Sequence, residues 1–151
     1  LGTAAWQVSS MSSTVIGLAT NGDVNENTGT FVAYCFAEVA GYSKFGSYTG
    51  NGTADGPFVF TGFRPAYVMI KRTDAGSNWE TMDTARDVDN VVSQILRPNT
   101  NDAEITTSAD IKDYLSNGFK LRGTGLDING SGGTYIFLAF AEYPFKHSNA
   151  R

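Results

Sequence analysis

The amino-acid sequence predicts an all-β fold, an antiparallel β-sandwich of jelly-roll-like type with room for one short helix. Aromatic residues make up 13% of the 151 residues, and the chain contains 17 glycines but only 4 prolines. This composition is typical of short strands joined by glycine-rich turns and is rare in helical bundles. A chain of this length can bury about 70% of its unfolded surface, which is enough for a true hydrophobic core.

Apolar runs bounded by turn residues predict the longer strands. TFVAYCFAEV (30–39) and TYIFLAFAEY (134–143) are apolar on both faces, which indicates central strands covered on each side. AYVMIKR (66–72) predicts a strand that turns through TDAGSN into the return strand WETMD (79–83).

Turn signals predict the remaining elements. Asn117-Gly118 is a strong hairpin signal within DYLSNGFKLRG (113–123). The glycine-rich stretch GSYTGNGTADGPF (46–58) predicts an irregular loop. ARDVDNVVSQIL (85–96) places apolar residues at helical spacing, so a short helix is one interpretation of this segment.

Two segments of the chain repeat each other at an offset of 104 positions, the difference between Thr30 and Thr134. Unrelated strands would share apolar character, but they would not share Asp, Asn, Gly and Glu at fixed spacing. The repeat therefore predicts equivalent sheet positions for Phe36 and Phe140. The identical pairs include Thr20/Thr124, Asp23/Asp127, Asn25/Asn129, Gly29/Gly133, Thr30/Thr134, Phe36/Phe140, Ala37/Ala141 and Glu38/Glu142.

The repeat period is about the size of a small domain. We therefore predict that residues 1–41 are the C-terminal end of a preceding similar module and that residues 42–151 form a complete β-sandwich module. The alternative is that residues 1–41 contribute the first strands of one sandwich. The start at Leu1 instead of Met is interpreted as a cut, with no signal peptide pattern.

Charge and cysteine content exclude several classes of partner. The formal net charge is -4, and the lysines and arginines are scattered, so no nucleic-acid partner is expected. The longest apolar runs fall short of the roughly 18 residues of a membrane span, so no membrane insertion is expected. Cys35, the single cysteine, excludes an internal disulfide, and it is predicted to be a small buried residue.

The sequence offers little material for catalysis, and we predict no catalytic residue. The only histidine, His147, lies in the terminal FKHSNAR, which predicts a solvated tail residue. Glu80, Asp83, Asp87 and Asp89 lie close together in sequence and could supply a carboxylate pair for glycoside hydrolysis. Solvated turn acids explain the same residues more simply.

A calcium loop is the nearest metal motif. Asp127 to Gly132 (DINGSG) resembles the first half of an EF-hand loop. Position twelve would be Leu138 instead of Glu, and Thr28 occupies the glycine position in the other repeat. We therefore predict no metal site and no cofactor.

Aromatic rings beside amide and carboxylate groups predict a carbohydrate site. Sugar rings stack their CH faces on aromatic side chains while their hydroxyls form hydrogen bonds. A core position is the alternative for Tyr48. The predicted ligand-binding residues are Trp79, Asn78, Asp74, Tyr48, Asn51 and Asp55.

The stretches SKFGSYTGNG, GFRPAYVMIKR, DTARD, LSNGFKLRG and GGTYIFLAFAEYPFK resemble a module that recurs in tail-fibre proteins of tailed bacteriophages. The resemblance covers most of the chain from about Asn25, and the terminal PFKHSNAR is similar to the ends of such proteins. It implies an extracellular virion part, a homotrimer in contact with other fibre segments, and a role in host adsorption.

Combined with the aromatic residues, this resemblance predicts a non-enzymatic fibre domain that binds a host surface glycan. The alternative is a purely structural trimerising segment or tip cap. Depolymerase activity would depend on the carboxylates between Glu80 and Asp89.

Overall fold

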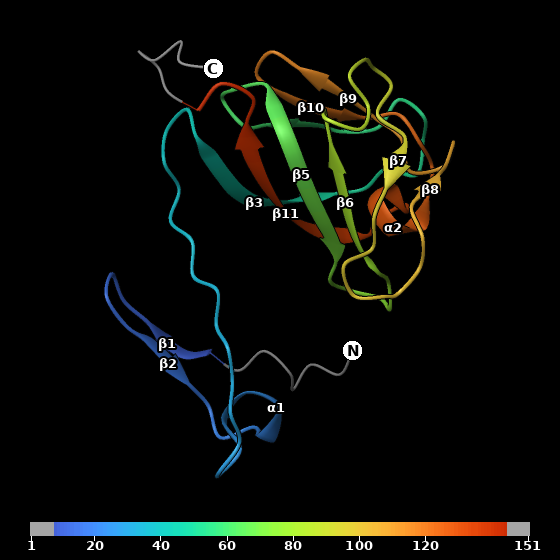
Figure 1. Cartoon of the computed structure of the whole chain (residues 1–151). Coiled ribbons are helices and arrows are strands. Elements are labelled where there is room, and N and C mark those ends of the chain that lie inside the picture. The colour runs from blue at the N-terminus through green and yellow to red at the C-terminus, as the bar shows by residue number, and fades with distance from the viewer. Residues whose placement is uncertain (1–7, 145–151) are drawn as a thin grey trace. The chain divides into compact units, whose positions relative to one another are not determined.

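The computed structural model describes residues 8–144, and the chain divides into two compact units, residues 1–36 (unit 1) and residues 37–151 (unit 2) (Figure 1). Each unit is described by itself. His147 and its neighbours in 145–151 lie outside the described residues. The assignment of residues 1–41 to a preceding module stays a prediction.

The fold is mostly β, with 38% of residues in strands, antiparallel sheets and 6% in helices, which confirms the predicted all-β, sandwich-like class. Two four-residue helices are present in the described residues, where one short helix was expected. The elements of unit 2 are β3 (Ser43–Thr49), β4 (Phe58–Phe60), β5 (Pro65–Arg72), β6 (Trp79–Asp83), β7 (Gln94–Ile95), β8 (Ile105–Thr106), β9 (Lys112–Leu115), β10 (Gly118–Leu121), α2 (Leu126–Asn129) and β11 (Thr134–Ala141).

The core of unit 2 lies between a four-stranded sheet, in the order β3-β11-β5-β6, and a three-stranded sheet, in the order β4-β10-β9 (Figure 1). β7 and β8 pair separately. Alternate residues of each strand point inward, as the two-residue period of a strand requires. The buried core includes Val59, Val68, Ile70, Met82, Tyr114, Phe119, Leu121, Tyr135, Phe137 and Ala139.

Strand β11 is the central strand predicted from TYIFLAFAEY. It pairs antiparallel with β3 on one side and with β5 on the other. β5 and β6 form the predicted hairpin around TDAGSN. β11 and β5 are inside the sheet and β6 is its edge strand. The prediction that the 134–143 strand is covered on each side was wrong, because Ile136 of β11 is 39% exposed on the side away from the core.

The Asn117-Gly118 signal is confirmed by the β9–β10 hairpin, in which Leu115 pairs with Gly118. Gly118 also pairs with Phe60 of β4. A Cβ at this position would overlap the carbonyl oxygen of Val59, so only glycine permits this close strand approach.

Two predicted segments in unit 2 were wrong. Residues 46–49 lie in β3, because they pair with β11, and only residues 50–57 form the loop. Residues 85–96 form a turn followed by β7 instead of a helix. Val88 is 71% exposed whereas Val92 and Ile95 are buried, so no helical face is buried along this segment.

Unit 1 contains the hairpin β1 (Val8–Met11) and β2 (Ile16–Leu18), followed by helix α1 (Gly22–Asn25). The side chain of Asn21 caps α1 by accepting a hydrogen bond of 2.8 Å from the backbone N–H of Asp23. No helix in the described residues has the length and apolar character needed to cross a membrane.

The strand predicted over residues 30–39 was wrong in this structure, and so was the equivalent placement of Phe36 and Phe140. Residues 30–38 form no strand, whereas Phe140 lies in β11. Cys35 is exposed, contrary to the predicted burial. The physical reason is shared: the described residues place no strand on either side of this segment.

Candidate functional site

An apolar surface lies on the side of the four-stranded sheet that faces away from the core. Its residues are fixed by register: Leu138 of β11 pairs with Phe45 of β3 and with Met69 of β5. We call this surface the outer face. Its apolar residues are half-buried or exposed, and the register places polar residues among them. The apolar residues are Phe45, Tyr67, Met69, Trp79, Ile136, Leu138 and Phe140, and the polar residues are Ser43, Ser47, Lys71, Thr81 and Asp83.

The outer face has two distinct ends. At one end the ring of Phe140 lies 5.7 Å from that of Tyr42, 6.3 Å from that of Phe45 and 6.2 Å from that of Tyr67, centroid to centroid. At the other end a shallow groove of about 480 Å³ runs past Trp79, Ile136 and Leu138. Partly exposed apolar side chains on the outer face of a sheet are a feature of surfaces that contact a ligand or another chain.

Trp79 and Asn78 come together with Asn99, a residue that the sequence did not indicate. The backbone N–H of Trp79 donates to Asn99 Oδ1 at 2.9 Å, and Asn99 Nδ2 donates to Asn78 Oδ1 at 2.9 Å. Pro98, Asn99 and Met69 line a second hollow beside the Trp79 ring. A half-buried indole beside two amide groups is an arrangement suited to a sugar ring.

Asp74 is held within the structure of the β5–β6 turn. Its carboxylate forms an ion pair with Arg72 at 2.8 Å and accepts a hydrogen bond from the backbone N–H of Thr134 at 3.2 Å. The hydrogen bond from Arg72 is the main cause that lowers the pKa of Asp74 to about 2. Asp74 therefore fixes the turn against the start of β11.

Tyr48 lies on the core side of β3. Its ring stacks on Tyr135 with centroids 5.1 Å apart, and its hydroxyl donates to the carbonyl oxygen of Ile128 at 2.7 Å. Burial raises the pKa of Tyr48 well above its ordinary value. Its side chain therefore stabilises the sandwich, as the alternative interpretation of this residue proposed.

Asn51 and Asp55 lie in the loop between β3 and β4, and no hydrogen bond or ion pair of the described residues joins them to the Trp79 group. The side chain of Asn51 forms a hydrogen bond within its own loop, in which Nδ2 donates to Asp55 O at 2.9 Å. Asp55 is exposed and forms an ion pair with Lys120 at 2.8 Å, which lowers its pKa. Of the six predicted residues, the structure therefore brings only Trp79 and Asn78 together on the outer face.

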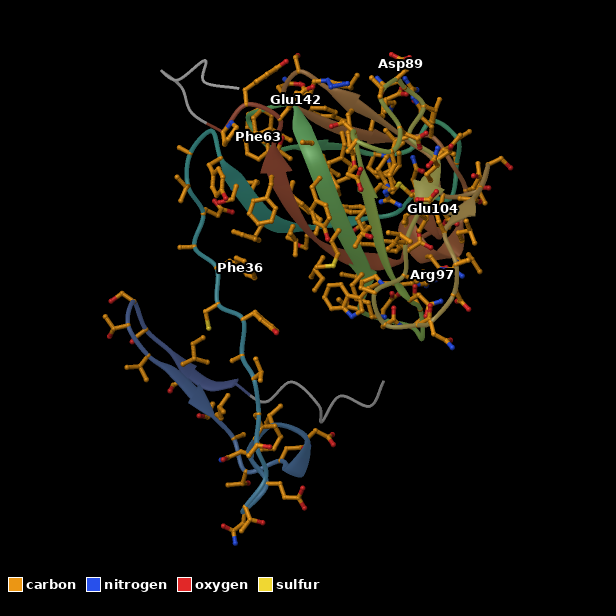
Figure 2. The ribbon with its side chains drawn as sticks, viewed as in Figure 1. Phe36, Phe63, Asp89, Arg97, Glu104 and Glu142 are labelled. Atoms are coloured by element: carbon orange, nitrogen blue, oxygen red, sulfur yellow. The ribbon has the colours of Figure 1, made fainter. Side chains whose placement is uncertain are left out.

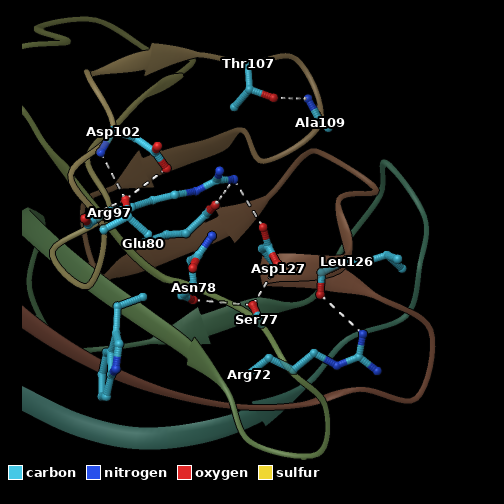
Figure 3. A network of polar contacts seen from close by, with 12 residues as sticks. Arg72, Ser77, Asn78, Glu80, Arg97, Asp102, Thr107, Ala109, Leu126 and Asp127 are labelled. Atoms are coloured by element: carbon cyan, nitrogen blue, oxygen red, sulfur yellow. Dashed lines mark hydrogen bonds and ion pairs between the residues drawn. The ribbon is translucent and has the colours of Figure 1, made fainter.

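A buried charge cluster lies inside the sandwich, on the other side of β6 from Trp79 (Figure 3). Carboxylate oxygens of Glu80, Asp110 and Asp127 lie within 4.8 Å of one another. One guanidinium nitrogen of Arg97 contacts Glu80 and Asp127, each at 3.2 Å. Glu80 has no exposed side-chain surface.

Lys112 is the second cation of the cluster. It is fully buried, and its ammonium group contacts the sulfur of Met82. Burial lowers the pKa of Lys112 to about 8, and burial raises the pKa of Glu80 to about 7. Burial also raises the pKa of Asp110. Arg97 and Lys112 thus offset only part of the charge of the three carboxylates, and the buried atoms Glu80 Oε2 and Asp110 Oδ1 have no hydrogen-bond partner among the described residues.

The remaining sequence candidates do not converge. Asp83 binds Arg86 at 2.7 Å, Asp87 accepts from the backbone N–H groups of Ser93 and Gln94, and Asp89 is exposed on a loop (Figure 2). Glu80 is buried away from them. In the DINGSG segment, Asp127 is paired with Arg97 and accepts from Ser77 Oγ at 2.7 Å, so its oxygens serve the charge cluster.

Comparisons with known proteins find one family. A family model described as a domain of unknown function (DUF7483) matches residues 2–144 of the chain. No curated protein and no solved structure matches it. The match spans residues of both units.

Proposed function

The chain belongs to the DUF7483 family of domains of unknown function, and we propose that this domain is a non-enzymatic part of a virion tail fibre that attaches to a host-cell surface glycan. The observation that carries the proposal is the half-buried Trp79 ring beside the linked amides of Asn78 and Asn99. The sequence resemblance to tail-fibre modules supplies the biological setting.

The proposed glycan site contains only some of the residues predicted from the sequence, together with Asn99. Trp79 supplies the stacking surface, and Asn78 and Asn99 supply amide groups at its edge. Asp74, Tyr48, Asn51 and Asp55 are left out of it, since their polar atoms hold turns and core contacts.

Trp79→Ala should reduce glycan binding at least about tenfold, because a central aromatic ring commonly dominates such a contact. The fold should survive, since the hydrogen bond to Asn99 comes from the backbone of residue 79 and the ring is half-buried. Binding to an array of bacterial surface polysaccharides, with urea unfolding beside it, provides the measurement.

Phe60→Ala is the matched control, because Phe60 is an exposed aromatic residue of the other sheet, 61% accessible. This variant should bind as the unchanged chain does. Equal binding by the unchanged chain and Trp79→Ala would refute the Trp79 site and favour the purely structural fibre segment. Release of reducing sugar from the polysaccharides would contradict the non-enzymatic assignment.

We also propose that the domain forms a homotrimer through the aromatic end of the outer face, which leaves the Trp79 end open to ligand. Tyr42, 40% exposed, lies there with its ring 5.7 Å from that of Phe140 and tilted by 59°. Three copies would multiply a weak glycan affinity by avidity.

Tyr42→Asp should shift the chain from trimer to monomer at micromolar concentration, because it buries a charge in the interface. Sedimentation equilibrium measures the mass of each species. Val88→Asp, on an exposed loop, should leave the trimer intact. A monomer formed by the unchanged chain at high concentration would rule out this assembly.

A further inference from the structure

Unit 1 repeats the C-terminal part of unit 2 element by element. β1 (Val8–Met11) and β9 (Lys112–Leu115) have the same bounds at an offset of 104, and so do α1 (Gly22–Asn25) and α2 (Leu126–Asn129). β2 (Ile16–Leu18) and β10 (Gly118–Leu121) complete the two hairpins with different bounds and register, since Met11 pairs with Ile16 whereas Leu115 pairs with Gly118. The sequence repeat therefore corresponds to a structural repeat of hairpin and short helix.

The hydrogen bonds of the two copies also agree. Asn25 Nδ2 donates to the carbonyl oxygen of Ala19 at 3.1 Å, and Asn129 Nδ2 donates to that of Gly123 at 2.8 Å. These acceptors are equivalent at the same offset. In both copies a backbone N–H after the helix donates to the carbonyl oxygen three residues earlier. Gly29 donates to Glu26 O at 3.1 Å, and Gly133 donates to Gly130 O at 3.0 Å.

The turn after each helix has the same backbone conformation. Gly132 has a φ of 72°, and Thr28 at the equivalent position has a φ of 68°. A left-handed conformation is uncommon for a β-branched residue and costs about 1 kcal/mol or more. Unit 1 keeps the turn that directs the chain into β11, although its sequence has lost the favourable glycine.

What differs is the strand that follows. β11 lies between β3 and β5, and its residues Tyr135 and Ala139 are fully buried. The equivalents in the first copy are Phe31, which is 49% exposed, and Cys35, which is also exposed. Tyr34 is 83% exposed. Phe31, Tyr34 and Cys35 are thus exposed at positions equivalent to Tyr135, Leu138 and Ala139 of β11, whereas the carbonyl oxygen of Ala37 and the carboxylate of Glu38 contact Ser43 and Lys44.

We propose that residues 30–38 are the central strand of a second sandwich, flanked by strands with the residue pattern of β3 and β5 that precede residue 8 in the same polypeptide. The complete copy shows what covers this surface. In unit 2 the hairpin, the helix and β11 follow β3 to β6 along the chain, so the missing strands belong ahead of the unit 1 hairpin.

A second copy of this chain fits the position less well. In each copy β3 and β5 already pair with β11 along its length, so no vacant position is left between them. An exposed apolar strand is also an aggregation hazard, which a covalently attached sheet removes without dependence on concentration.

A fusion tests the proposal. Residues 39–104, which contain β3 to β7, are placed directly ahead of Leu1 of the full chain, so that the 104-residue period continues. Cys35 is the only cysteine of the chain and lies outside the duplicated residues, so it reports on one site in both proteins. Its labelling by a thiol reagent should be rapid in the unfused chain and at least about 100-fold slower in the fusion, where a closed strand must open first.

Phe31→Asp in the fusion is the matched variant, since the equivalent Tyr135 is fully buried. This variant should label as fast as the unfused chain. Hydrogen exchange at β11 serves as an internal reference for folding. Rapid Cys35 labelling in a fusion whose β11 amides are protected would overturn the proposal. Concentration-dependent protection of Cys35 in the unfused chain would overturn it in favour of a second copy.

A strand exchange gives an independent measurement if the fusion does not fold. Residues 30–37 replace residues 134–141 in the otherwise unchanged chain, so that the first-copy strand must serve as β11. Retained folding, with the introduced thiol slow to react, supports the proposed role of residues 30–38. Complete loss of cooperative unfolding would show that this segment cannot act as a central strand between β3 and β5.

Discussion

Gly123→Ala should destabilise unit 2 by about 3 kcal/mol, near the upper end for an overpacking substitution. A Cβ at residue 123 would overlap the carbonyl oxygen of Ala109. The backbone has little freedom to relax, because the N–H of Gly123 donates to Ile111 O at 3.1 Å and its carbonyl oxygen accepts from Asn129 Nδ2 at 2.8 Å. Urea unfolding followed by tryptophan fluorescence measures the change.

Gly76→Ala is the control for that substitution. No atom lies within 4 Å of the position that a Cβ would take at residue 76, in the turn between β5 and β6. The control should therefore unfold at nearly the same urea concentration as the unchanged chain. Equal stability of the two variants would mean that the segment containing Ala109 can move aside.

Local sequence patterns predicted the strands that pair with the next segment of the chain. The β5–β6 hairpin and the Asn117-Gly118 turn follow from alternation and turn chemistry alone. Strand β3 was not predicted: residues 43–45 were given no element, and GSYT, which contains a glycine, was placed in the loop. Its strand conformation depends on pairing with β11, far along the chain, and residue composition does not report such a contact.

The segment 30–38 shows the opposite failure. Its apolar pattern correctly matches that of β11, but a pattern indicates only what a strand would need on each side. Among the described residues the strands that flank such a segment are β3 and β5, and both pair with β11. The mismatch between pattern and environment is itself informative, because it leads to the inference of a second sheet.

The candidate site was only partly predictable. Trp79 and Asn78 were indicated by their position at a turn, whereas Asn99 reaches them from a loop twenty residues away. The charge cluster was missed for a similar reason. Glu80, Asp110 and Asp127 belong to three separate segments, and no spacing in the sequence connects them.

Arg97→Met should destabilise the sandwich by about 3 kcal/mol at pH 8, because removing one partner of a buried ion pair leaves an uncompensated carboxylate. The side chain of Glu80 has no exposed surface, and Arg97 is its ion-pair partner at 3.2 Å. Methionine keeps much of the volume of the arginine stem, so packing should change little.

The effect should depend on pH in a defined direction. The pKa of Glu80 is about 7 in the folded chain, above the ordinary value of 4.5, so the folded state binds this proton more tightly than the unfolded state. The contribution of Glu80 to folding is therefore fully present below about pH 4.5 and is lost as pH rises through about 7. Loss of Arg97 raises the folded pKa further, so the variant should lose more stability over that range than the unchanged chain.

Urea unfolding at pH 5, 6, 7 and 8 measures this difference, which should grow from less than about 1 kcal/mol at pH 5 to the full effect at pH 8. The double variant Arg97→Met/Glu80→Gln removes both charges together and should recover most of the stability lost at pH 8. A destabilisation by Arg97→Met that is equal at pH 5 and pH 8 would mean that Arg97 acts through packing and its contact with Asp127, and that it does not neutralise Glu80.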